Sequence, residues 1–317
     1  MYDIAPDVSR WLADGQDPTI AVVVAVRGFG TGATATAWAW LPDGSRAGRP
    51  LAGLDGGTVP DRGLVEVTVS DADAARDGLA CGGAATLLVQ RASDYPVDLW
   101  SRLADGEPVC LVTTTQPPRT QLLTPATIRD AGGDAAARLF GRGSSTAAVV
   151  ADDPTRIAVA LWPVPTIVVV GDGLIAAALR DLAALLGWPA RITPQVEAAV
   201  DAIKQLRRSD AVVVLSHDRD VDGPALTAAL RGAAGYVGGL GARHTQAARR
   251  EWLTAHGVSA DEQARVHGPA GLDIDAHTPG EIAVSIVAEF LATRAGSSGG
   301  ALRDRGGPVH AASAPPH

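Results

Sequence analysis

Residues 166–188 read TIVVVGDGLIAAALRDLAALLGW, and this stretch decides the predicted fold. Positions 167–170 form a β-branched run without polar alternation, which is typical of a strand covered on both faces. The glycine turn GDG at 171–173 comes next, and an alanine-rich segment with helical spacing follows it. A strand, a glycine turn and a helix in this order predict the first half of a βαβ unit.

The turn has the spacing G-x-G-x-x-A, with Gly171, Gly173 and Ala176 as its small residues. Small residues let a phosphate approach the backbone at a helix N-terminus. Nucleotide dehydrogenases usually carry an acid about 20 residues later, but Thr193 and Pro194 stand there. Two interpretations stay open: a site for a phosphate-bearing ligand, or a scaffold in which the glycines only permit tight packing.

The chain has 317 residues, which suits two domains with separate cores. Its formal net charge of −8 argues against nucleic-acid binding, which needs a basic surface. No apolar run approaches the length of a membrane span, and the first residues lack the pattern of a secretory leader. Two cysteines without paired spacing do not predict a disulfide framework. We therefore expect a cytoplasmic protein.

Pro163 and Pro165 mark the predicted boundary between two domains. We expect an α/β protein, with a mixed α/β N-terminal domain at 1–162 and a Rossmann-like C-terminal domain with a parallel sheet at 163–295. Residues 296–317 are low in apolar content, which predicts a disordered tail.

Periodicity and turn signals place the other elements. In the N-terminal domain they predict helices at 3–15 and 98–107, strands at 19–26, 33–41 and 65–69, a loop at 53–63, a strand after Gly83, and further strands to 161. In the C-terminal domain they predict strands at 211–215 and 235–239, and helices at 194–207, 246–256 and 281–293.

Cys81 is followed by Gly82, Gly83 and a predicted strand. The glycines would leave the thiol uncrowded and the neighbouring amides available to an anion. The alternative is a buried cysteine that acts as a small hydrophobe. Cys110 lies within an apolar strand sequence, and we expect it in the core.

Polar residues follow the strand at 211–215, at the edge where ligands of open parallel sheets bind. His217, Asp218, Asp220 and Asp222 lie close together there, but their spacing matches no strong metal-ligand pattern. We favour hydrogen bonds to loops and predict no metal site.

The next strand end carries Gly239, Gly241 and Arg243 before a helix. Glycines and an arginine at that place predict an anion cradle. The alternative is that Thr245 only caps the helix and that Arg243 is solvated.

A loop at 268–277 contains Gly271 and Asp273, and a capping box follows it. Thr278 and Glu281 have the spacing of such a box, with Pro279 at the first helical position. Capping thus explains Glu281 before any catalytic role is considered.

Several segments in order resemble the XdhC/CoxI family, the accessory proteins of molybdenum hydroxylases such as xanthine dehydrogenase. The segments are GTGATATAW at 30–38, GLACGG at 78–83, VVVGDG at 168–173, VVVLSHDRDVDGPAL at 212–226, YVGGLGARHT at 236–245 and GPAGLDIDAHTPGEIAVSIVAEF at 268–290.

The resemblance implies a cofactor chaperone more than a turnover enzyme. Such a protein binds the molybdenum cofactor (molybdopterin, in a mononucleotide or dinucleotide form), protects it while its sulfido ligand is installed, and delivers it to an apo molybdenum hydroxylase. A homodimer and transient contact with a cysteine desulfurase are implied as well. Cys81 would be the thiol ligand or sulfur-handling group. The cofactor-binding residues would be Cys81, Gly82, Gly83, Gly171, Gly173, His217, Asp218, Gly239, Gly241, Arg243, Gly271 and Asp273.

The chain departs from the family pattern at a second cysteine, which usually follows Ser-Gly-Gly. Gly56, Gly57 and Thr58 stand in that region, so Cys81 would have to act alone. Two rival functions remain open: an NAD(P)-dependent oxidoreductase, and a scaffold that has lost its ligand.

Overall fold

The computed structural model describes residues 1–28, 34–51, 62–76, 82–131, 133–150, 153–216 and 218–304. They form two compact units, Met1–Pro163 (the N-terminal unit) and Val164–Asp304 (the C-terminal unit). The predicted loop at 53–63 and tail at 296–317 lie largely outside these residues, although Leu302–Asp304 forms a short 3-10 helix. Among the described helices, none is long and apolar enough to cross a membrane.

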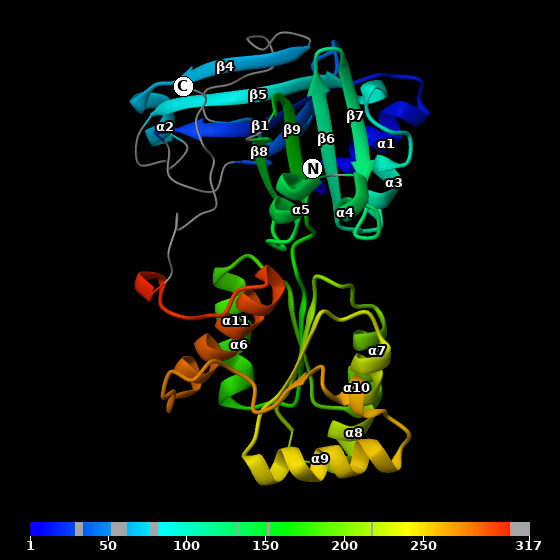
Figure 1. Ribbon diagram of the computed structural model, residues 1–317, viewed down its shortest axis with the longest axis vertical. Coiled ribbons are helices and arrows are strands. Elements are labelled where there is room, and N and C mark those ends of the chain that lie inside the picture. Colours follow the sequence, from blue (N-terminus) through cyan, green and yellow to red (C-terminus); the bar gives the residue numbers. More distant parts are fainter. Residues whose placement is uncertain are drawn as a thin grey trace. The chain divides into compact units, whose positions relative to one another are not determined.

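The N-terminal unit contains two antiparallel sheets (Figure 1). The five-stranded sheet has the order β3-β2-β1-β5-β4, and the four-stranded sheet has the order β7-β6-β9-β8. The strands of the first sheet are β1 Thr19–Arg27, β2 Ala37–Trp40, β3 Arg46–Gly48, β4 Gly63–Val69 and β5 Gly83–Arg91. Those of the second are β6 Val109–Thr115, β7 Pro118–Leu123, β8 Thr146–Val150 and β9 Asp153–Leu161.

The described residues of this unit also form the α-helices α1 Ala5–Ala13, α2 Asp71–Arg76, α3 Leu99–Ala104, α4 Ile128–Ala131 and α5 Gly133–Phe140. One core contains apolar side chains of both sheets, α1 and α3, such as Val22 and Leu111. A second core lies between the four-stranded sheet and the α4–α5 pair, and it contains Cys110 and Phe140. The core position of Cys110 is as predicted, and desolvation raises the pKa of its thiol to about 12.

The C-terminal unit is built on a parallel sheet with the order β11-β10-β12-β13-β14. The strands are β10 Ile167–Val170, β11 Ala190–Thr193, β12 Ala211–Val214, β13 Tyr236–Gly239 and β14 Val266–His267. The helices are α6 Leu174–Leu185, α7 Val196–Lys204, α8 Arg219–Arg231, α9 Arg243–Ala255, α10 Ala260–Gln263 and α11 Pro279–Ala295. The predicted α/β fold with a parallel, Rossmann-like C-terminal sheet is thus confirmed.

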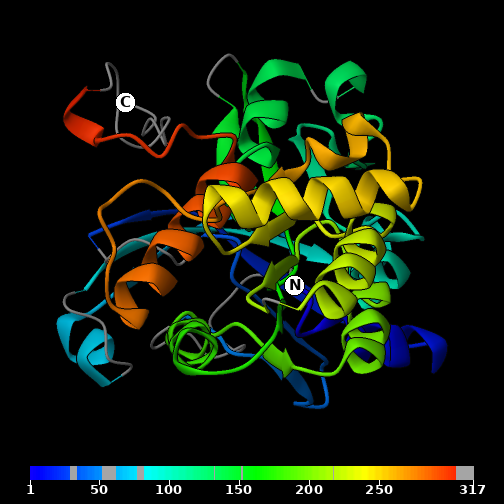
Figure 2. The ribbon, with the colours of Figure 1, turned by 90° about the horizontal axis from the view of Figure 1, so that it is seen from below.

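Helices cover both faces of this sheet. One core joins alternate strand residues to α6 and α11, and the other joins the remaining strand residues to α7, α8 and α9. The residues of β10 are therefore all buried, as a run without polar alternation predicts. Figure 2 shows α9, in yellow, lying across the direction of α6.

Two expectations about helices were wrong. Only further strands were expected between residue 107 and residue 161, but Ile128–Ala131 and Gly133–Phe140 form α4 and α5. The helix expected at 246–256 begins earlier, at Arg243 with Ala242 as its N-cap, so the alternative that Thr245 caps it is excluded.

The capping box of α11 is confirmed. The Thr278 hydroxyl accepts a hydrogen bond from the Glu281 N–H at 3.3 Å, and the Glu281 carboxylate accepts one from the Thr278 N–H at 2.8 Å. The helix ends at Gly296, which has a left-handed backbone with φ 62°. Backbone hydrogen bonds from Thr278 and His277 lower the pKa of Glu281, which fits a capping role.

Candidate functional site

A pocket of about 660 Å³ lies at the carboxyl edge of the parallel sheet. Its walls come from the segments that follow β10, β11, β12 and β13, and from the first turn of α11. The strand order changes direction between β10 and β12, which is where ligands of open parallel sheets bind. Gly171 and Asp218, both predicted site residues, line the pocket, and Leu174, Leu215 and Leu240 give it apolar walls.

The two glycines of the GDG turn differ in what their surroundings require of them. A Cβ on Gly171 would lie 3.0 Å from the Ser216 nitrogen, and the φ of Gly171 is +119°. Close packing of β10 against the end of β12 therefore requires this glycine. Gly173 also has a positive φ, of +89°, but a Cβ there would meet nothing within 4 Å. Packing therefore explains Gly171 but not Gly173, for which the ligand interpretation stays a prediction.

The N-terminus of α6 faces the open space at Gly173. Gly173 is its N-cap and makes no side-chain capping bond, and the first turn, residues 174–177, contains no acidic residue. The first N–H groups of a helix lack intrahelical partners and attract anions. Leu174, the first helical residue, lines the pocket and is 76% exposed. The backbone amides of this turn are thus placed to bind an anion.

Asp218 has a structural role at the pocket rim. Its carboxylate accepts a hydrogen bond from the Asp220 N–H at 2.9 Å and so caps α8. The Asp218 N–H donates to the Ser216 hydroxyl at 3.0 Å. Asp218 therefore forms hydrogen bonds within the loop, as we predicted for the polar residues at this strand end. His217 lies outside the described residues.

A buried ion pair lies behind the pocket wall. The Arg249 guanidinium contacts the Asp222 carboxylate at 2.6 Å, and both side chains are at most 5% exposed. The same guanidinium donates to the backbone oxygens of Ser216 at 2.9 Å and of Leu240 at 2.5 Å. Arg249 therefore ties together the segments that follow β12 and β13. Within the described part of the chain no cluster of metal-ligating side chains exists, and Asp222 pairs with an arginine instead.

Sequence reasoning missed Arg249. It lies in the segment AARREW of α9, whose charged residues are typical of an exposed helix. The glycine at the end of β13 was the one hint in the sequence that a large side chain packs there. A Cβ on Gly239 would lie 3.1 Å from the Arg249 Nη1 atom. Gly239 thus makes room for the guanidinium.

The predicted anion cradle at α9 adjoins Leu240. Gly241 has φ +130°, and its carbonyl accepts a hydrogen bond from Gln246 at 3.1 Å. Arg243 and His244 are exposed in the first turn, where a positive charge is disfavoured by the helix dipole. Neither side chain forms an ion pair with another described residue. These two side chains could therefore face an anion without giving up an existing partner.

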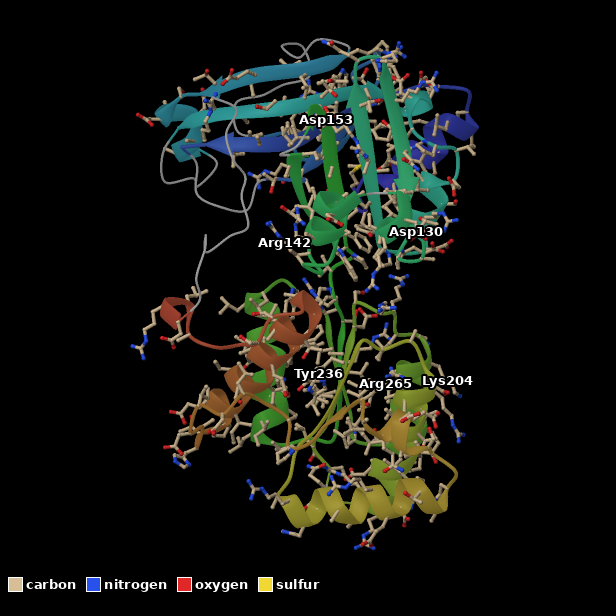
Figure 3. All side chains as sticks on the ribbon, viewed as in Figure 1. Asp130, Arg142, Asp153, Lys204, Tyr236 and Arg265 are labelled. Atoms are coloured by element: carbon tan, nitrogen blue, oxygen red, sulfur yellow. The ribbon has the colours of Figure 1, made fainter. Side chains whose placement is uncertain are left out.

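The loop with Gly271 and Asp273 is held against α11. The Gly271 N–H donates to Glu289 at 2.8 Å, and a Cβ on Gly271 would collide with the Ser285 hydroxyl. Glu289 also accepts hydrogen bonds from Tyr236 at 2.6 Å and from His267 at 3.1 Å. Figure 3 labels Tyr236 inside the unit. Neither Gly271 nor Asp273 lines the pocket, so the structure does not bring them together with Gly171.

In the N-terminal unit, Cys81 lies outside the described residues. The Gly82 N–H donates to the Asp71 carboxylate at 2.8 Å, and a Cβ on Gly82 would collide with the Val69 carbonyl. The expectation that this amide is available to an anion is therefore wrong, because Asp71 already binds it. Gly83 begins β5 and pairs with Val69. Gly82 thus serves the close approach of the start of β5 to the end of β4.

Comparisons with known proteins found one matching family model, curated relatives and a solved structure. Residues 167–290 match the family model described as the XdhC Rossmann domain. The molybdenum cofactor insertion chaperone PaoD of Escherichia coli is 30% identical over 132 residues, which is 42% of this chain and 41% of PaoD. The uncharacterized protein YqeB of Escherichia coli is 28% identical over 159 residues, 44% of this chain and 29% of YqeB.

The chain thus spans less than half the length of these curated relatives. A solved structure described as a xanthine dehydrogenase from Bacillus halodurans aligns with 91% of this chain and 95% of its own, at 17% identity and a TM-score of 0.47.

Proposed function

Because residues 167–290 match the family model of the XdhC Rossmann domain, we propose that this chain is an accessory protein that binds the molybdenum cofactor and takes part in its maturation and insertion. The similarity to a molybdenum cofactor insertion chaperone supports a role in cofactor maturation. The observation that carries the proposal is the pocket between the ends of β10 and β12, which lies inside the matched domain.

The residues present fit a pterin with a phosphate group. A volume of about 660 Å³ lies in the range of small-molecule sites, roughly 300–1,000 Å³. The N-terminus of α6 would hold the phosphate through the amides that follow Gly173. Apolar walls from Leu174, Leu215 and Leu240 would cover the flat ring system. The bound cofactor supplies the molybdenum centre that a hydroxylase later uses.

Further parts of the proposal rest on the family resemblance. Cys81 would be the thiol that contacts the metal end of the cofactor, and an apo molybdenum hydroxylase would be the recipient. A homodimer, transient contact with a cysteine desulfurase, and a cytoplasmic location belong to the same proposal. His217, Gly239, Gly241 and Arg243 would complete the cofactor site.

Leu174→Glu tests the pocket. The new carboxylate would stand at the N-terminus of α6, where it stabilises the helix but repels a phosphate. Leu174→Gln is the neutral control of similar size. Leu185→Glu is the positional control, because Leu185 lies at the other end of α6 and is 82% exposed.

The assay is activation of an apo molybdenum hydroxylase by protein purified from a host that makes the cofactor. Wild type, Leu174→Gln and Leu185→Glu should activate the recipient, and Leu174→Glu should not. Equal activity of all four proteins would exclude this pocket. Saturable NAD(P)H binding that Leu174→Glu abolishes, with no activation by any protein, would instead support an oxidoreductase.

A further inference from the structure

A second groove, of about 680 Å³, lies within the N-terminal unit. It is lined by side chains of α3, β6, β7 and β9 and of the turn before α4. Three arginines, Arg102, Arg119 and Arg156, line it against one acid, Asp98. The whole chain has a net charge of −8, so this excess of positive charge runs against the overall balance.

The strand register places two of these arginines in one row. Thr114 of β6 pairs with Arg119 of β7 on one side and with Arg156 of β9 on the other. Directly paired residues of antiparallel strands point to the same face of a sheet. Neighbouring strands lie about 4.8 Å apart, so the Cα atoms of the two arginines are roughly 10 Å apart. Both guanidinium groups can therefore reach one ligand above Thr114.

In the described part of the chain no ion pair within 4 Å includes Arg119 or Arg156. The charge of Arg156 does help to lower the pKa of Asp153, after the hydrogen bonds that Thr155 donates to that carboxylate. By contrast, Arg102 pairs with Asp98 at 2.8 Å and with Glu107 at 2.6 Å. Asp153, labelled in Figure 3, lies at the start of β9. Its carboxylate accepts a hydrogen bond of 2.5 Å from the Thr155 hydroxyl.

The charged donors that line the groove without a close ion pair are the guanidinium groups of Arg119 and Arg156. The Thr114 hydroxyl hydrogen-bonds to the carbonyls of Pro117 at 3.1 Å and Arg119 at 3.3 Å, so its proton is already used. Two like charges that flank a threonine repel each other, and a bound anion would remove this repulsion.

We propose that this groove binds a small phosphate-bearing molecule, held between the guanidinium groups of Arg119 and Arg156. Guanidinium groups bind phosphate oxygens in a bidentate manner. An added peptide strand is disfavoured because the outer strand β7 begins at Pro118, directly after Pro117. The site is independent of the pocket in the C-terminal unit.

Inorganic pyrophosphate is the probe, titrated into the full chain with 15N-labelled arginine side chains. The titration uses the Leu174→Glu background, which removes anion binding at α6. The Nε–Hε signals of Arg119 and Arg156 should shift together and saturate. Arg119→Gln and Arg156→Gln should each weaken binding at least tenfold, as the loss of a charge-assisted hydrogen bond predicts.

Arg46→Gln is the control, because Arg46 is an exposed arginine of β3 outside the groove, and it should leave the affinity unchanged. Shifts spread over all arginines, or an equal loss in Arg46→Gln, would overturn the proposal. It would also be overturned if an acidic peptide saturated the site and pyrophosphate did not. A result in either direction leaves the molybdenum cofactor proposal intact, since that rests on the other unit.

Discussion

Arg249 of α9 and Asp222 of α8 form a buried ion pair, with 2.6 Å between Nη2 and Oδ2. Because the same guanidinium binds the backbone of Ser216 and Leu240, the pair fixes two of the segments that border the pocket. Removal of one partner would leave a charge buried without compensation.

We expect Arg249→Met to lower the free energy of unfolding by about 3–5 kcal/mol. The substitution keeps much of the side-chain volume but leaves the Asp222 carboxylate buried. Urea unfolding of the full chain measures the effect. Arg250→Met is the matched control at the next, exposed position, and should change stability by less than about 0.5 kcal/mol. Similar stability of both variants would contradict a structural role for the pair.

The two glycines of the GDG turn should respond differently to alanine. Gly173→Ala should cost about 1–3 kcal/mol, because φ 89° with ψ −166° is a backbone conformation that is essentially restricted to glycine, while a Cβ would meet open space. Gly171→Ala should cost more, because its Cβ would also press on the Ser216 nitrogen. Unfolding curves of the two variants give the comparison. A larger loss for Gly173→Ala would show that the packing argument is wrong.

Glu289 should make stability depend on pH in the acid range. Burial alone would raise the pKa of its carboxyl, but hydrogen bonds from Tyr236, Gly271 and His267 outweigh burial and lower it. A carboxyl whose pKa is lower in the folded state contributes stability above its unfolded pKa, about 4.3, and loses it as pH falls through the folded pKa.

The measurement is the difference in unfolding free energy between wild type and Glu289→Gln across a pH series. The difference should be constant above about pH 5 and shrink as the pH falls below about 4.3. Glu251→Gln, at an exposed position of α9, is the control and should show no such change. A difference that grows toward low pH would have the wrong sign.

The thiol of Cys110 should not react in the folded protein. It is fully buried, and burial raises its pKa to about 12, so the thiolate is scarce at neutral pH. In a Cys81→Ser variant, a thiol reagent should therefore label the chain only after denaturation. Rapid labelling of wild type under native conditions would then report Cys81 and would support its proposed role. Rapid labelling of the Cys81→Ser variant would refute the burial of Cys110.

Local patterns in the sequence predicted much of the C-terminal unit. The run at 167–170, the GDG turn and the helix after it needed only hydrophobic periodicity and turn chemistry. The capping box at Thr278 is a local signal as well, and it was confirmed.

Contacts between distant residues could not be predicted in this way. The partner of Arg249 lies 27 positions away on another helix, and Asp71 binds the amide of Gly82 from 11 positions away. Helix α4 has only 4 residues, too few for a periodic pattern, and its stability comes from packing on the four-stranded sheet. The row of Thr114, Arg119 and Arg156 depends on the register of three strands, which no local motif specifies.

The most direct test of the central claim is the pterin content of the purified protein. Wild type, Leu174→Glu, Leu174→Gln and Leu185→Glu would be isolated from a host that makes molybdenum cofactor, and oxidised pterin fluorescence and molybdenum would be measured per chain. The account predicts pterin in wild type and both controls, and its loss in Leu174→Glu at a thermal stability no lower than that of wild type. Pterin absent from all four proteins, or retained in Leu174→Glu, would contradict it.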